Sequence, residues 1–155
     1  MISPNAYALS RMYSDLTGLQ VSFTVKPRST PSKNRLIFGV YSELPAQDTI
    51  LLRADLPLLA SMGGALVGLP DSIVNERIRA STLDETLRDA MHEVLNITST
   101  LLSTAHRVIF KTMYTDAAHL SGPALSILNS PILATCFDVS IQGYTGGELS
   151  IFSDL

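Results

Sequence analysis

Asp89, Glu93 and Asn96 are the residues whose types and spacing could do chemistry. They follow one another by four and then three positions, so in a helix their side chains project from the same side. A carboxylate accepts hydrogen bonds from a cation, and a carboxamide both donates and accepts them, so the cluster could position a water or bind a partner's lysine. A solvated helix face has the same composition, because charged residues are rarely buried, and the spacing fits both interpretations.

A long amphipathic helix from about residue 82 to 103 must position these residues. Its apolar side carries Leu83, Leu87, Ala90, Met91, Val94, Leu101 and Leu102. Its polar side carries Glu85, Asp89, Glu93, Asn96 and Thr100. Ser81 or Thr82 is expected to cap the helix, because Glu85 follows Thr82 by three residues, which is the spacing of a capping box.

The remaining elements predict an α+β domain. Helical patterns cover residues 5–18, with Asn5 as the cap and Gly18 as the end, and residues 57–67, 71–78 and 123–128. Strand patterns cover residues 19–25, 35–41, 49–53, 107–115, 132–142 and 148–152, and the glycine-rich segment 143–147 is typical of a hairpin turn. Because the helices are grouped between runs of strands, we expect a largely antiparallel sheet with the helices on one face.

Composition narrows the class of protein. The chain has 155 residues, which is the size of one domain, and its net charge of −3 argues against a nucleic-acid partner. Charged residues make up only 16% of it, and so few charges indicate an apolar surface that a second copy covers. The apolar stretch 56–69 is too short to cross a membrane, and the first fifteen residues do not resemble a secretory signal.

Other chemistry is less favoured. His92, His106 and His119 have no thiol or carboxylate at the short spacing of a zinc site. The single cysteine, Cys136, lies in an apolar strand, where a buried and inert thiol is the usual case. One cysteine cannot form an internal disulfide, so the expected location is the cytoplasm.

Three consecutive segments carry a resemblance to a known family. They are Leu51-Leu-Arg-Ala-Asp55, the stretch that ends Leu66-Val-Gly-Leu-Pro70, and Leu83-Asp-Glu-Thr-Leu-Arg-Asp-Ala-Met-His-Glu-Val-Leu-Asn96. The third contains the signature acidic-x-x-x-Glu-x-x-Asn. Over residues 51–104 the chain thereby resembles the CheC/CheX/FliY family of chemotaxis phosphatases. The signature occurs once, as in the single-site CheX branch, and residues 1–155 are expected to form one CheX-like domain.

This resemblance implies hydrolysis of the phospho-aspartate on the receiver domain of a response regulator such as CheY. In that role Glu93 pairs with a lysine of the partner, Asn96 orients the attacking water, and Asp89 and Thr100 contact the partner. The partner's receiver domain holds the magnesium ion, and no cofactor is expected in this chain. The CheX branch also implies a homodimer.

A non-catalytic role is the alternative: a dimeric scaffold or binding protein that keeps the CheX-like fold. Leu95 bears on this choice, because family members often have alanine or glycine before the asparagine. The bulky side chain at this position is expected to obstruct docking of the partner.

Overall fold

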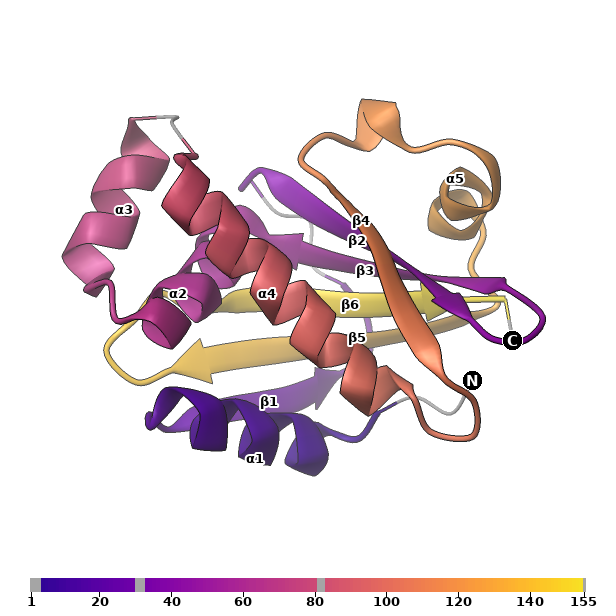
Figure 1. Cartoon of the computed structure of the whole chain (residues 1–155), viewed down its shortest axis with the longest axis horizontal. Helices are drawn as coiled ribbons and strands as arrows, with labels where there is room; N and C mark the ends of the chain where they lie inside the picture. Colours follow the sequence, from indigo (N-terminus) through magenta and orange to yellow (C-terminus); the bar gives the residue numbers. More distant parts are fainter. Residues whose placement is uncertain (1–3, 30–32, 81–82, 155) are drawn as a thin grey trace.

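The computed structural model describes residues 4–29, 33–80 and 83–154, which form six strands and the helices around them (Figure 1). In chain order the elements are α1 (Ala6–Thr17), β1 (Val21–Lys26), β2 (Leu36–Glu43), β3 (Asp48–Asp55), α2 (Leu56–Val67), α3 (Asp71–Arg79), α4 (Glu85–Leu102), β4 (Val108–Tyr114), the short 3-10 helix η1 (Ala117–His119), α5 (Gly122–Asn129), β5 (Leu133–Ile141) and β6 (Gly147–Ser153).

The strands form a single sheet in the order β1-β5-β6-β3-β2-β4, and each neighbouring pair is antiparallel. Each strand and helix predicted from the sequence is present, with ends that differ by a few residues. Asn5 caps α1 by accepting from the Ala8 amide at 2.7 Å, and Gly18 ends it with a φ of 70°. The prediction of an α+β fold with an antiparallel sheet is confirmed.

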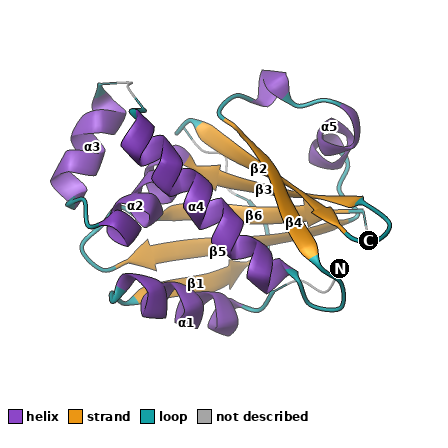
Figure 2. Ribbon diagram, in the orientation of Figure 1, coloured by secondary structure: helices purple, strands orange, loops and turns teal. Residues whose placement is uncertain are grey.

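The two faces of the sheet carry different helices (Figure 2). Helices α1, α2 and α4 pack on one face, where they share a core with Ile50 and Leu52. Helix α5 packs on the opposite face, where Ile127 joins a second core with Phe38 and Leu51. The expected placement of the helices on one face therefore needs a correction for α5. Its cause is that β2 and β3 are apolar on both sides, and a buried apolar face needs a cover.

One irregularity in the sheet lies beside α4. Tyr41 of β2 pairs with Phe110 of β4, whereas the preceding Val40 pairs with Thr112, so the register shifts and Lys111 has no partner position. This is the geometry of a β-bulge, in which one strand has an extra residue. It lets Phe110 and Met113 both contribute to the core that α4 covers.

Helices α2 and α4 pack closely because α2 has a glycine at their contact. A Cβ atom on Gly63 would lie 3.1 Å from the Cβ of Ala90 and 3.1 Å from the amide nitrogen of Met91. Few side chains tolerate such contacts, so Gly63 fixes how near α4 lies to α2. In the described part of the chain, no helix is both long enough and apolar enough to span a membrane.

We expect Gly63→Val to destabilise the fold by about 1–3 kcal/mol, because the added methyl groups meet the backbone of α4. The free energy of unfolding in urea measures this loss. Ala65→Val is the control, since Ala65 lies half-buried in the same helix. Equal destabilisation by the two variants would show that the close approach at Gly63 does not limit the packing.

Candidate functional site on the outer face of α4

Helix α4 begins at an aspartate rather than at the predicted cap. The side chain of Asp84 accepts a hydrogen bond from the Leu87 amide at 2.8 Å, so Asp84 is the N-cap and Glu85 is the first helical residue. The prediction of a capping box with Glu85 three residues past the cap is therefore wrong, and Ser81 and Thr82 lie outside the described residues. Arg77 of α3 pairs with Asp84 at 2.8 Å and links the start of α4 to α3.

Two tyrosines hold the inner side of α4 in place. The hydroxyl of Tyr41 on β2 donates to the backbone carbonyl of Leu95 at 2.7 Å. The hydroxyl of Tyr13 on α1 is hydrogen-bonded to that of Thr98, which also donates to the Val94 carbonyl at 2.7 Å. Both tyrosines are buried, so these polar contacts are shielded from water and fix the rotation of the helix about its axis.

Leu95 is part of this buried side. It is fully buried, and its Cδ2 atom lies 3.1 Å from where a Cβ atom on Gly39 of β2 would be. The large leucine thus fits over a glycine in the sheet. The concern that Leu95 obstructs a partner is wrong, because its side chain faces the core.

The opposite side of α4 is open to solvent, and we call it the outer face: Asp89, Glu93, Asn96 and Thr100, all of them exposed. Within the described residues, none of these four side chains has a hydrogen bond or ion pair to the rest of the chain. The structure therefore brings together the four residues that the sequence singled out. Their side chains are available to another molecule.

A groove runs beside the outer face, between α4 and β4. It has a volume of about 360 Å³ and is lined by Asn96, Ser99, Thr100, Ser103 and residues 107–110. One of these lining residues is Arg107, which is exposed. Sequence reasoning missed Arg107 as part of this region. The signal was present, because Arg107 begins the strand pattern that directly follows the helix.

His92 lies on the flank of α4 toward β4. Its ring contacts that of Phe110 edge-on, with 5.7 Å between the ring centres. In residues 4–29, 33–80 and 83–154, no three His, Cys, Asp or Glu side chains gather closely enough to bind a metal ion. The outer face offers carboxylate, carboxamide and hydroxyl groups, which form hydrogen bonds and charge pairs.

Burial raises the pKa of both anchoring tyrosines. For Tyr13 the loss of solvation outweighs the opposite effect of the hydrogen bond with Thr98, and for Tyr41 the burial dominates. A tyrosine with a raised pKa in the folded state stays protonated at a pH where the unfolded chain already ionises, near pH 10. Its contribution to stability is complete below that pH and is lost as the pH rises above it.

We therefore expect the free energy of unfolding to fall above about pH 10, by about 1.4 kcal/mol per pH unit for each of the two tyrosines. Urea unfolding between pH 8 and pH 11 measures this slope. Tyr41→Phe should remove about half of it. A slope that is the same in this variant and the wild type would contradict the assignment.

Comparison with known proteins identifies the fold. No protein-family model and no curated protein sequence matches the chain. Solved structures do match: the FliM middle domain of Vibrio alginolyticus has a TM-score of 0.64 and 10% identity, over 96% of this chain and 88% of that one. FliM in its complex with FliG from H. pylori has a TM-score of 0.57 and 13% identity, over 96% and 85%.

Thermotoga maritima FliY is also similar, with a TM-score of 0.51 and 14% identity, over 93% of this chain and 81% of that one. The chain has the fold of the CheC/CheX/FliY family. At these identities the likeness is one of fold alone. The specific assignment to the CheX branch stays a prediction, because similarity to FliM and FliY domains does not separate one branch from another.

Proposed function

We propose that the protein hydrolyses the phospho-aspartate of a response-regulator receiver domain, with Glu93 and Asn96 as the residues that act. The observation that carries the proposal is their arrangement: a carboxylate and a carboxamide one turn apart, both exposed and both without a partner among the described residues. They lie on a helix whose other side is fixed by buried tyrosine hydrogen bonds. Such a support holds groups in the position that a reaction needs.

The two side chains have different tasks. Glu93 pairs with a lysine of the partner and thereby docks α4 over the phosphorylated aspartate. The Asn96 carboxamide then binds a water and holds it in line with the bond that breaks. The water oxygen attacks phosphorus, the aspartate oxygen leaves as a carboxylate, and phosphate is released. The magnesium ion of the receiver domain neutralises charge on the phosphoryl oxygens.

The rest of the outer face contacts the partner. Asp89 lies one turn before Glu93 and adds negative charge on the side that meets the lysine. Thr100 lies about one turn after Asn96 and is small enough for a receiver domain to approach. The groove along β4 leaves room for the partner's loops beside Asn96.

The test is phosphate release from purified CheY-class receiver domains phosphorylated with a small acyl phosphate. Asn96→Ala should lower kcat about 100-fold, because the water loses its position. Glu93→Gln should raise KM about tenfold with a smaller effect on kcat, because docking loses a charge pair. Arg88→Ala is the control, since Arg88 is an exposed residue of α4 outside the outer face. Wild-type rates in both site variants would overturn the proposal.

Bulk at Thr100 should block docking. We expect Thr100→Phe to raise KM at least tenfold while the free energy of unfolding stays within about 0.5 kcal/mol of the wild type, because the side chain is exposed. Thr24→Phe makes the same change at an exposed position of β1, in a different element of the fold. If the two variants have equal KM values, Thr100 lies outside the contact with the partner.

A non-catalytic docking domain is the second candidate, and the likeness to FliM middle domains favours it, one of them solved in complex with FliG. In that case the receiver domain or another protein binds the outer face without loss of phosphate. Binding that Glu93→Gln weakens, with no phosphate release by the wild type, would support this candidate. The homodimer stays a prediction from the low content of charged residues.

A further inference from the structure

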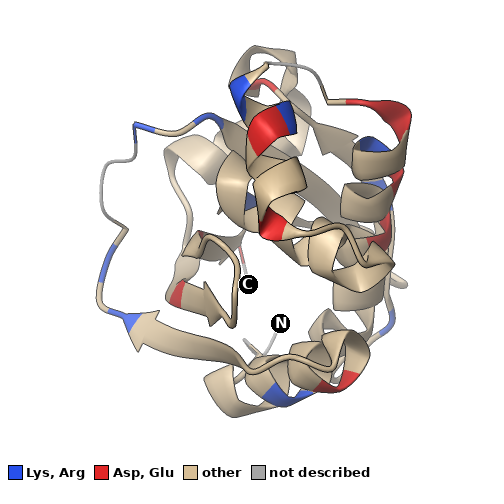
Figure 3. Ribbon diagram, turned by 90° about the vertical axis from the view of Figure 1, so that its left-hand side faces the viewer, with Lys and Arg blue, Asp and Glu red and all other residues tan. Residues whose placement is uncertain are grey.

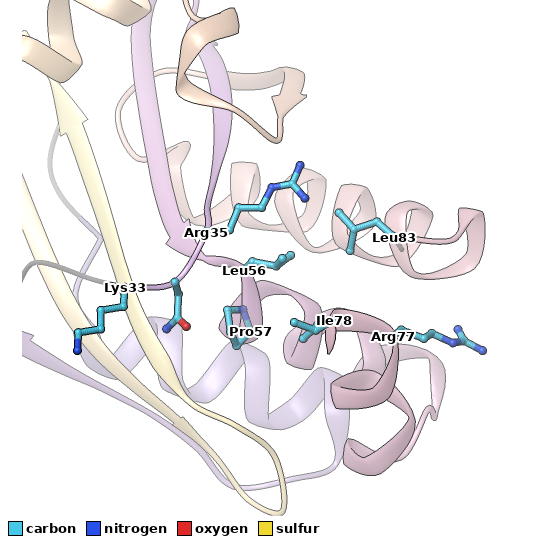
Figure 4. A pocket seen from close by; sticks show the side chains of 8 residues that line it. Lys33, Arg35, Leu56, Pro57, Arg77, Ile78 and Leu83 are labelled. Carbon is cyan, nitrogen blue, oxygen red and sulfur yellow. The ribbon is translucent and has the colours of Figure 1, made fainter. Parts of the chain in front are cut away.

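A second concave surface lies away from the outer face of α4, and we call it the basic pocket. Its volume is about 240 Å³, and it lies where α2 and α3 meet the segment before β2 and the segment before α4. The floor is apolar and consists of Leu56, Pro57, Ile78 and Leu83 (Figure 4). None of the four residues of the outer face lines it, so this surface is independent of the proposed phosphatase site.

Cations surround the apolar floor. Lys33, Arg35 and Arg77 line the pocket together with Asn34, and among the described residues no aspartate or glutamate does. Figure 4 shows the three cationic side chains extending outward from the central Leu56, Pro57 and Ile78. The charges thus lie around the apolar floor rather than converging on one point.

These cations are only partly engaged within the chain. Arg77 pairs with Asp84 at 2.8 Å, and Arg35 uses its Nε atom to donate to the Thr115 carbonyl at 3.1 Å. In the described part of the chain, Lys33 has no hydrogen bond or ion pair. Lys33 and the terminal nitrogens of Arg35 can therefore bind anionic groups of another molecule.

The region around the basic pocket is positively charged, whereas the whole protein has a net charge of −3. From Lys26 to Arg35 there are four cations and no acidic residue, and of the four Lys26 pairs with Glu148 at 3.0 Å and Asp138 at 3.2 Å. Figure 3 shows blue segments along this connection from β1 to β2 and no red ones. A positive region on an otherwise acidic protein selects partners of negative charge.

We infer that the basic pocket binds a short acidic peptide segment of a partner protein. An aliphatic side chain of that segment enters the pocket and covers Leu56 and Ile78, and carboxylates on either side pair with Lys33 and Arg35. A free phosphate fits the site less well, because the cations diverge around an apolar floor. Nucleic acid fits less well too, since none of the residues that line the pocket is aromatic and could stack on a base.

The test uses a hexapeptide of two leucines with two acidic residues on each side, carrying a neutral fluorescent dye, and measures anisotropy at low salt. The wild type should bind it, and Lys33→Glu with Arg35→Glu should weaken binding at least tenfold, or about 1.4 kcal/mol. Lys33→Glu alone, at an exposed position, should weaken it about threefold. Arg28→Glu is the control in the same connection, at an exposed residue that does not line the pocket, and should weaken binding less than Lys33→Glu does, since it changes only the surrounding charge.

Two further probes separate the parts of the proposal. A peptide with serines in place of the leucines should bind at least tenfold more weakly, and one with lysines in place of the acids should not bind. Equal binding of the leucine and serine peptides, or equal loss in Lys33→Glu and Arg28→Glu, would overturn the inference. Tighter binding of a single-stranded oligonucleotide than of the acidic peptide would also overturn it.

Discussion

The hydrogen bond from the Tyr41 hydroxyl to the Leu95 carbonyl is the contact on which the candidate site depends most. It joins the middle of a central helix to a strand of the sheet, inside a core that water does not enter. Because Leu95 also fills the space above Gly39, the helix cannot rotate without both breaking this bond and opening a cavity. The direction of the neighbouring Asn96, away from the core, follows from this contact.

Much of the fold and of the candidate site on the outer face of α4 could be predicted from the sequence, because both are encoded in local patterns. Asn5 and Gly18 bound α1, and the four residues of the outer face share one side of α4, since both features need only helix geometry and capping chemistry. The start of α4 was not predicted. Ser81 or Thr82 was expected as the cap, whereas the cap is Asp84, which an ion pair with Arg77 joins to α3.

What the sequence did not predict requires knowledge of tertiary neighbours. The bulk of Leu95 raised the concern of a blocked partner, and only Gly39, distant in sequence, shows where that bulk is accommodated. The placement of α5 on the opposite face depends on β2 and β3 being apolar on both sides. The basic pocket gathers residues of α2 and α3 with residues of the segments before β2 and before α4, so no single stretch carries its signal. One fold can serve many functions, so function rests on such residues rather than on the fold.

The bulge in β4 has a consequence for how the sheet tolerates change. Lys111 is exposed and occupies the extra position in the strand. Because paired residues of neighbouring strands face the same side of a sheet, loss of this one residue would leave Phe110 opposite Tyr41 and Thr112 opposite Val40 in an unbroken ladder. Val108 and Phe110 would keep their places in the core, and His92 would keep its aromatic neighbour. Lys111 thus marks a position at which the strand can lose a residue without turning a core side chain out to solvent.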